Sequence, residues 1–284
     1  MPYDRTLIVI RERSFLDLLD LALLVVRDRP VVLGLTAIAG IAPFAAFNVW
    51  LMSGDDSRFV LWVLLLIMET PWATAPLTVA LGDLMFGVRP RPRKIVKTLV
   101  VSFPSLFLTQ FLIRGMCYLI LIGYVLWPAQ FAFHNEVLLL VCYLILIGYV
   151  LMPAQFAFLN EVLLLERAGP LRAVKRSRDI SRRFEGELFL RWLGQIALGL
   201  TFALCFQKGA ESFGSVLAGG DVTWERAAQV DAGDLLFQAG VWIAIAFFTV
   251  VRFLSYIDRR IRLEGWEIEL RLRSVGRALE ERPQ

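Results

Sequence analysis

Residues 59–86 read FVLWVLLLIMETPWATAPLTVALGDLMF, and RPRPRK follows at 89–94. The first stretch holds only two carboxylates and exceeds the about 20 apolar residues that a helix needs to cross the hydrocarbon core of a bilayer. The basic run after it is typical of a loop that stays in the cytoplasm, because Lys and Arg concentrate on that side of a membrane. We therefore expect a membrane-spanning helix that ends on the cytoplasmic side.

The composition of the whole chain has the same character. Of its 284 residues, 57% are hydrophobic and 20% are charged, whereas soluble domains have about 45–50% and about 25%. These values exclude fibrous, disordered and disulfide-scaffold proteins. The three cysteines form no CxxC pair and the single histidine is His134, so we expect no metal site, no disulfide framework and no cofactor.

Apolar runs long enough to cross a membrane recur along the chain. We expect an all-α fold, a polytopic membrane helix bundle of about six spans with amphipathic cytoplasmic helices at both ends (residues 1–30 and 257–284). The expected transmembrane domain covers 31–256, with spans at 31–52, 59–86, 98–127, 131–152, 188–206 and 235–256.

The basic residues are segregated between alternate loops. Of the 30 Lys and Arg, 24 fall on one side of the expected spans and three on the other, while Arg114, Arg191 and Arg252 lie inside spans. This asymmetry predicts that both termini are cytoplasmic and that the number of spans is even. We expect a multi-pass protein of the cell inner (plasma) membrane.

A tandem repeat lies between two of the basic loops. Residues 117–141 and 142–166 are identical at 22 of 25 positions, which indicates a recent or artificial duplication rather than an ancient repeat architecture. An assembly error in the sequence is an alternative. Because both flanking loops are basic, the intervening residues must cross the membrane an even number of times, and their length favours two crossings.

The repeat can be divided between these two crossings in more than one way. Our preferred division kinks the third span at Pro104, places the fourth at 131–152 and leaves 153–166 at the cytoplasmic interface, running into the basic segment. A rival division turns at Arg114 and Gly115 and leaves the second copy as the interfacial piece. An extra crossing would instead invert every downstream loop against its charge.

The N-terminal region is expected to hold an amphipathic helix. Ser14 and Asp17 form a capping-box pattern at its start. The residues at helical spacing that would form its apolar stripe are Phe15, Leu18, Leu19, Ala22 and Val26. This stripe could lie along the lipid headgroups, or it could pack on the protein's own bundle.

Ionisable residues inside spans are costly and are functional candidates by default. Glu69 lies ten residues into the second span, where a transporter would place a carboxylate that carries a coupling proton; the alternative is a structural pair with Arg114. Glu136 and Glu161 are copies of one another in the repeat, so one of them is expected to be surplus. Near the cytoplasmic span ends, Arg191 and Arg252 are expected to extend their charged groups toward water.

Residues 167–187 form a basic segment, in which Pro170 is expected to open a helix with a thin apolar stripe of Leu171, Val174 and Ile180. Such a helix would face the anionic lipids of the inner leaflet. The expected headgroup contacts are Arg172, Lys175, Arg176, Arg178, Arg182 and Arg183. The tail carries a heptad-like seam from Ile261 to Leu279, which could pack on the chain itself or bind a partner helix.

Two short motifs resemble those of a known family of bacterial membrane proteins. The first comprises Glu166, Gly169, Pro170, Ala173, Arg176 and Ser177. The second is the tail YIDRRIRLEGWEIEL (256–270), which is similar to a YxDxRxRxEGxDxE ending, with Glu267 where Asp is usual. Both resemble the glycerophosphoryl diester phosphodiesterase membrane-domain family. This resemblance implies a six-span fold and little chemistry, because the hydrolase of such phosphodiesterases is a separate soluble domain; the duplication departs from the family pattern.

No specific catalytic motif occurs in the chain, and the expected function is not enzymatic. The leading hypothesis is a membrane scaffold or assembly protein that grips anionic lipids of the inner leaflet. Its further partners would be a membrane protein or a second copy of itself, and not nucleic acid. The alternative hypothesis is a transporter or channel that uses Glu69 and Arg114.

Overall fold

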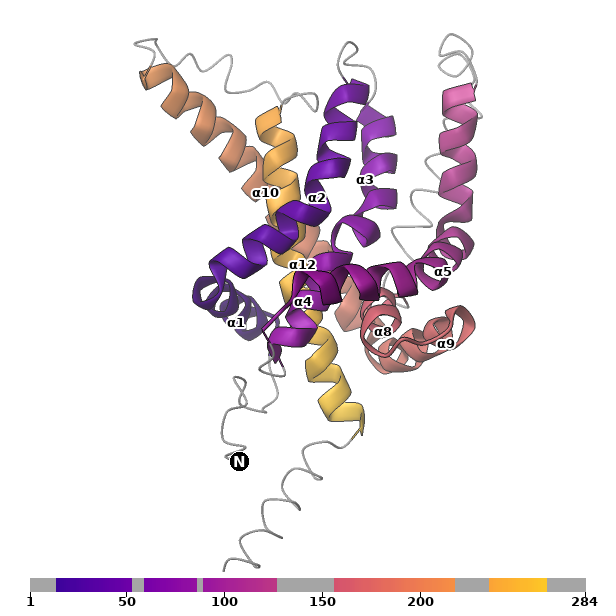
Figure 1. Ribbon diagram of the computed structural model, residues 1–284. Helices are drawn as coiled ribbons and strands as arrows, with labels where there is room; N and C mark the ends of the chain where they lie inside the picture. Colours follow the sequence, from indigo (N-terminus) through magenta and orange to yellow (C-terminus); the bar gives the residue numbers. More distant parts are fainter. Residues whose placement is uncertain (1–13, 53–58, 86–88, 127–155, 218–234, 265–284) are drawn as a thin grey trace, which may run out of the picture.

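The computed structural model describes residues 14–52, 59–85, 89–126, 156–217 and 235–264, and in these ranges the chain forms helices and no strand (Figure 1). The expected all-α fold class is therefore confirmed for this part of the chain. The elements are α1 (Phe15–Asp28), α2 (Pro30–Met52), α3 (Phe59–Ala73), α4 (Ala75–Met85), α5 (Pro92–Leu126), α8 (Leu159–Leu165), α9 (Pro170–Ser181), the 3-10 turn η2 (Arg182–Phe184), α10 (Glu185–Leu217) and α12 (Leu235–Glu264).

Four helical segments in the described ranges are long and apolar enough to cross a membrane. They are Pro30–Leu51, Trp62–Met85, Glu185–Leu217 and Leu235–Leu263. They overlap four of the expected spans, those at 31–52, 59–86, 188–206 and 235–256. The chain thus has the helices of a membrane protein, because about 20 apolar residues in helical form match the thickness of the hydrocarbon core.

The other two expected spans have different outcomes. The third falls within α5, which is 35 residues long and is not among the four segments above. In Figure 1 this helix first runs across the bundle and then turns upward at the right of the view; near the bend, Phe103 and Phe107 contact Trp72 of α3. Pro104 lies inside it, and an internal proline is a common cause of such a bend. The fourth span, at 131–152, lies outside the described residues, as do the tail from 265 and the first 13 residues.

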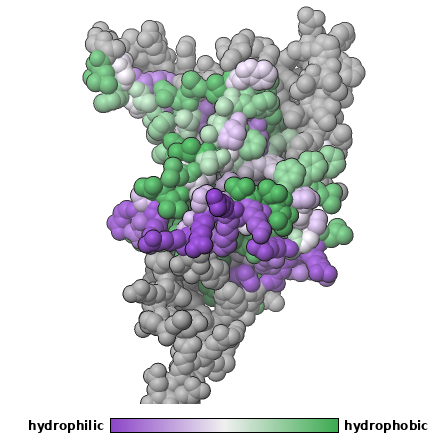
Figure 2. Space-filling view, in the orientation of Figure 1, coloured by the Kyte–Doolittle hydropathy of each residue, from purple (hydrophilic) through white to green (hydrophobic). Residues whose placement is uncertain are grey.

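One end of the bundle collects the basic segments, and we call it the basic end. There α2, α5 and α10 begin and α4 and α12 finish, close to α1, α8 and α9 (Figure 1). Figure 2 shows a belt of hydrophilic residues at this level, with mostly hydrophobic residues above it. The described ends on either side of 127–155 lie at opposite ends of the bundle, since α5 finishes far from the basic end and α8 lies at it. The described helices thus run alternately toward and away from the basic end, which agrees with the segregation of Lys and Arg between alternate loops.

The four membrane-length segments divide into two central and two outer ones. In Trp62–Met85 and Leu235–Leu263, 67% and 61% of the most apolar stretch is buried, whereas the values are 11% and 17% for Pro30–Leu51 and Glu185–Leu217. The outer helices expose large apolar side chains, which a bilayer would accept without cost. These include Leu35, Ile38 and Phe47 of α2 and Leu190, Ile196 and Leu200 of α10.

The N-terminal helix α1 forms with the expected capping box. Ser14 Oγ accepts a hydrogen bond from the Asp17 backbone N–H, and Asp17 Oδ2 accepts one from the Ser14 backbone N–H. Leu18 and Ala22 of the expected apolar stripe are fully buried in the core, and α1 lies against α12. Of the two alternatives for this stripe, packing on the protein's own bundle is therefore the one observed. The opposite face exposes Leu16 and other apolar residues.

The second expected span is broken where its prolines predicted an interruption. Helix α3 ends at Ala73, a turn at Thr74 follows, and α4 continues to Met85. Because Pro71 and Pro76 have no N–H, each removes a helical hydrogen bond. At the turn, the Thr70 carbonyl accepts both the Thr74 backbone N–H at 3.0 Å and the Thr74 hydroxyl at 2.7 Å.

Helix α2 passes so close to this break that only glycine fits at Gly40. A Cβ atom at that position would lie 2.1 Å from the Ala73 carbonyl oxygen and 3.1 Å from the Pro76 ring. At Gly34, one and a half turns earlier on the same helix, no described atom lies within 4 Å of a Cβ. The small residue thus lets two helices approach at backbone distance, as is common between helices in membranes.

We predict that Gly40→Ala destabilises the protein by about 1 to 3 kcal/mol, because the added methyl group overpacks the contact with Ala73. The matched variant Gly34→Ala should be neutral or slightly stabilising, because Ala is the better helix former. The measurement is the apparent melting temperature of each purified variant in the same detergent. Equal melting temperatures for the two variants would contradict the close approach.

Candidate functional site

The strongest candidate of the sequence, Glu69, is buried near the helix break. Its side chain is 7% exposed, and Asn48 of α2, itself fully buried, donates a hydrogen bond from Nδ2 to Glu69 Oε2 at 2.8 Å. An amide rather than a cation is thus the contact that the structure describes for this carboxylate. Buried polar groups need such partners, especially in a bilayer, where water cannot supply one.

The pairing of Glu69 with Arg114 stays a prediction. The backbone of Arg114 lies in α5, and its side chain is outside the described part of the structure. Glu136, in the first repeat copy, also lies outside the described residues. The structure therefore brings Glu69 together with Asn48 and leaves its relation to these two residues open to experiment.

Asn160 of α8 connects three helices through its amide group. Its Oδ1 accepts from Nε2 of Gln110 on α5 at 2.8 Å, and its Nδ2 donates to the backbone carbonyl of Pro71 at 3.1 Å. In an unbroken helix that carbonyl would accept from the backbone four residues on. Because α3 ends at Ala73, a side chain from α8 supplies the missing donor.

The next residue, Glu161, is fully buried and forms an ion pair with α12. Arg252 Nε donates to Glu161 Oε1 at 2.7 Å. The expectation that Arg252 extends toward water is therefore wrong, because its guanidinium points into the bundle and pairs with the buried carboxylate of Glu161. Of the two equivalent glutamates of the repeat, Glu161 in the second copy therefore has a structural role, the pairing with Arg252. Helix α8 leads into the basic segment, as expected. The segment Leu159–Leu164 is buried throughout, however, so α8 lies inside the bundle and not at the membrane interface where 153–166 was expected.

Glu166, at the C-terminal end of α8, gathers a second group of polar side chains. Tyr256 of α12 donates its hydroxyl to Glu166 Oε1 at 2.7 Å. The guanidinium groups of Arg176 and Arg260 lie 3.5 and 3.7 Å from the same carboxylate. Through this one side chain, α8, α9 and α12 are tied together at the basic end.

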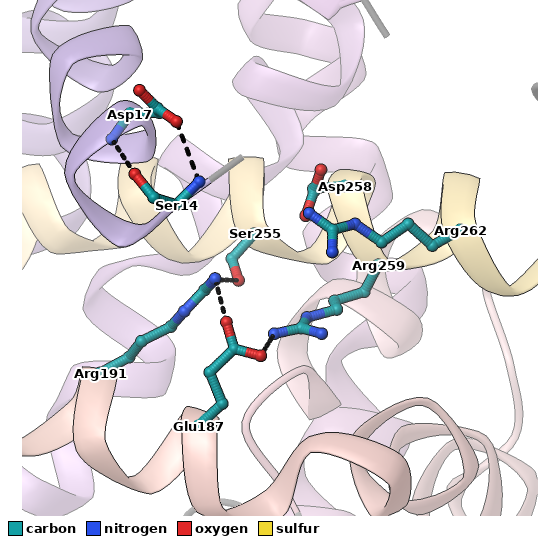
Figure 3. Close-up of polar contacts among 8 residues, drawn as sticks. All are labelled: Ser14, Asp17, Glu187, Arg191, Ser255, Asp258, Arg259 and Arg262. Carbon is teal, nitrogen blue, oxygen red and sulfur yellow. Dashed lines mark hydrogen bonds and ion pairs between the residues drawn. The ribbon is translucent and has the colours of Figure 1, made fainter. Parts of the chain in front are cut away.

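Glu187 forms a third group, between α10 and α12 (Figure 3). Its carboxylate accepts hydrogen bonds from both Arg191 and Arg259, and Arg191 Nη1 also donates to Ser255 Oγ at 3.1 Å. The guanidinium carbon of Arg259 lies 3.8 Å from the centre of the Phe184 ring, a cation-π contact. The expectation that Arg191 extends toward water is thus also wrong, since its side chain is buried and paired.

The basic helix α9 begins at Pro170 as expected, and two of the three residues of its expected apolar stripe pack inward. Ile180 is buried and Val174 is half-buried against the core, whereas Leu171 is 79% exposed. Ala173 and Ser177 are also buried, and such small residues let helices lie close together. The expected headgroup residues that are exposed are Arg172, Lys175, Arg178 and Arg182; Arg176 is half-buried beside Glu166, and the side chain of Arg183 is outside the described part.

No grouping of His, Cys, Asp and Glu suited to a metal ion occurs among the described residues. The carboxylate of Glu69 faces an amide, and those of Glu161, Glu166 and Glu187 face arginines. These partners are hydrogen-bond donors, and a hydrogen-bonded assembly of this kind holds helices in place. Comparison with protein-family models, with curated proteins and with solved structures finds no match.

The sequence contained a signal for some of the residues that its interpretation missed. Asn48, Gln110 and Asn160 are amides inside apolar runs, and such residues form hydrogen bonds between helices in membranes. Glu187 carries no such signal, because it ends the basic segment just before the expected span at 188–206, where a carboxylate needs no explanation. Its importance follows only from the arrival of Arg259, 72 residues later in the chain.

We predict that Glu161→Leu lowers the free energy of unfolding by about 3 to 5 kcal/mol, since it leaves the Arg252 charge without its buried partner. The double variant Glu161→Leu/Arg252→Met should recover most of this loss. The measurement is chemical or thermal unfolding in detergent. Glu136→Leu, the same change in the other repeat copy, is the matched control and should leave stability unchanged. A loss of equal size for the double variant would refute the pairing.

Proposed function

We propose that this chain is a non-enzymatic membrane scaffold or assembly protein whose basic end lies against the anionic inner leaflet of a cell membrane. The observation that carries the proposal is the outward face of α9. Three basic residues there are exposed, as is Arg182 directly after the helix, and Leu171 beside them is 79% exposed. Cations around a projecting apolar side chain are typical of helices that lie in a membrane interface.

The polar contacts between helices support a fixed architecture rather than a mobile one. The carboxylates of Glu69 and Glu161 are buried, and that of Glu187, although exposed, contacts the buried Arg191 and Arg259. Holding helices together through buried polar groups favours one arrangement over others, because every alternative leaves some of these groups without partners. A scaffold needs such a fixed arrangement.

The orientation and the six-span topology belong to the same proposal. The helix ends at the basic end are those that the charge segregation assigns to the cytoplasm. Membership of the glycerophosphoryl diester phosphodiesterase membrane-domain family would agree with this topology. Glu166, Pro170 and Arg176 of its motif have structural roles here: Pro170 begins α9, and the other two form an ion pair. A second copy or another membrane protein is the proposed partner for the exposed apolar faces of α2 and α10.

We predict that neutralising the exposed face of α9 (Arg172→Gln, Lys175→Gln, Arg178→Gln and Arg182→Gln) weakens the preference for anionic lipid severalfold. Each basic residue near an anionic surface contributes about 1 kcal/mol. The measurement is the ratio of phosphatidylglycerol to phosphatidylcholine retained after purification from vesicles with equal amounts of both.

The control for this variant keeps the charge and changes the side chains: Arg172→Lys, Arg178→Lys and Arg182→Lys should retain the original ratio. High salt should lower the preference of the unmodified protein, because it screens exposed charges. An unchanged ratio in the neutral variant would remove the main support for the proposal.

One observation favours a second candidate function, a transporter. Glu69 lies two residues before Pro71, whose carbonyl is freed by the helix break, and broken helices with a carboxylate near mid-membrane form ion sites in transporters. Against it stands the contact between Glu69 and Asn48, which gives the carboxylate a structural role.

We predict that vesicles containing the protein conduct protons no faster than protein-free vesicles, and that Glu69→Gln does not alter this rate. The measurement is the fluorescence of an enclosed pH dye after a step in external pH. Asp83→Asn, at the basic end, is the matched acidic control. A proton flux that Glu69→Gln abolishes and Asp83→Asn leaves intact would favour the transporter and displace the scaffold.

A further inference from the structure

A small hollow with basic side chains in its lining lies at the basic end, between α5 and the connection from α8 to α9. Its volume is about 230 Å³, and it is lined by Lys94, Lys97, Thr98, Val101 and Arg167. The α5 residues stand at the first position and three, four and seven residues after it, so they share one face of the helix. On that same face Ser105 donates a hydrogen bond to the Ala168 carbonyl at 3.3 Å, which holds the connection against α5.

The charge in this hollow is positive and largely unneutralised. Lys94 Nζ contacts Asp83 Oδ1 at 2.5 Å, so part of its charge is offset. Lys97 and Arg167, however, have no ion pair or hydrogen bond among the described residues. This contrasts with the arginines of α10 and α12, which face carboxylates. Two free cations and a nearby hydroxyl, that of Thr98, are the groups with which proteins bind phosphate.

The backbone at Arg167 gives this residue an unusual position. Its φ angle is 50°, in the left-handed region that follows many helices and that glycine usually occupies. Arg167 lies directly after Glu166, the last residue associated with α8. Glycine would be the easier choice there, so replacing Arg167 by Gly removes the cation without imposing strain on the fold.

An apolar surface adjoins the charged hollow. A second, more open hollow along α5 is lined by Pro92, Arg93, Val96, Lys97, Val100 and Val101. It shares Lys97 and Val101 with the first. Val96, Val100 and Val101 are 59%, 66% and 65% exposed. A cationic pocket that opens onto exposed valines matches a molecule with a phosphate at one end and a hydrocarbon chain at the other.

We propose that this is a binding site for one anionic phospholipid: Lys97, Arg167 and Thr98 hold the phosphate, Lys94 assists, and the acyl chain lies on Val96, Val100 and Val101. The cations disfavour a choline headgroup, because its trimethylammonium would approach them with like charge. The apolar surface distinguishes a lipid from free inorganic phosphate, which would gain nothing from it. The site uses none of the exposed α9 residues, and it rests on the proposed function only in placing the basic end against lipid headgroups.

The test is native mass spectrometry of the full-length protein in a mild detergent, with phosphatidic acid, phosphatidylglycerol or phosphatidylcholine added. We expect one phosphatidic acid or phosphatidylglycerol bound per protein at low lipid concentration, and phosphatidylcholine bound at least tenfold more weakly. Inorganic phosphate in excess should not displace the lipid. Equal binding of phosphatidylcholine, or full displacement by inorganic phosphate, would overturn the proposal.

The variant Lys97→Gln/Arg167→Gly should weaken this first binding event at least tenfold. Arg89→Gln/Arg91→Gln removes the same charge from the start of the same region, outside both hollows, and should change the affinity by less than twofold. Equal losses in the two variants would mean that only general charge attracts the lipid, and would reject the site.

The neutral α9 variant separates this proposal from the proposed function. If that variant keeps the single tightly bound lipid but loses its general anionic preference, both proposals stand. If Lys97→Gln/Arg167→Gly binds the first lipid normally while the α9 variant loses its preference, the site is rejected and the scaffold hypothesis survives. If Lys97→Gln/Arg167→Gly loses the first lipid while the neutral α9 variant keeps its general anionic preference, the site stands and the α9 face does not hold the protein to anionic lipid.

Discussion

Hydrocarbon offers no hydrogen bonds, so every polar group inside a membrane bundle must find its partner within the protein. In this chain a helix of seven residues, α8, supplies the partners on which the rest of the bundle depends. Asn160 satisfies the carbonyl that the proline break leaves open in the second span, and Glu161 beside it pairs with Arg252 of α12. Two consecutive side chains thus connect a broken helix, the bent helix α5 and the central helix α12. The break and the bend can persist because α8 is there.

The sequence was informative wherever the decisive property is local. Span length, hydropathy and the position of prolines belong to short stretches, and they predict α2, the interrupted α3 and α4, and the starts of α10 and α12 within a few residues; α10 continues eleven residues past the expected end, to Leu217. The capping box of α1 was predicted for the same reason, because Ser14 and Asp17 need only each other. The α12 helix differs in one respect: it continues to Glu264, beyond the expected end at Tyr256, since its basic last turns are held by Glu166 and Glu187 rather than released into a tail.

The candidate site was predicted less well, because a pairing depends on residues far apart in the chain. Glu69 stands out in the sequence as a charge inside an apolar run. Its partner Asn48 is an uncharged residue in another span, so its signal is weaker. Arg191 and Arg252 were expected near water, a sound rule for an isolated helix. Carboxylates on neighbouring helices reverse that rule here. On α9 the expected apolar stripe is right for Val174 and Ile180 but not for Leu171, while Ala173 and Ser177 are buried without having been expected. Small residues at a helix contact carry little hydrophobic signal in the sequence.

The basic residues that are expected to determine the orientation fall into two groups in the folded protein, those that pair with carboxylates and those that stay exposed. Arg176, Arg259 and Arg260 face carboxylates and hold helices together. The exposed basic residues of α9, together with Lys97 and Arg167, form no ion pair among the described residues and remain available to anions. The count of positive charges treats both groups alike, because insertion into the membrane responds to charge before the helices have packed. Only the fold divides them. A protein that needed these charges for topology alone could pair every one of them, and the clustering of the unpaired ones beside exposed leucine and valine side chains is what directs the functional interpretation toward lipid.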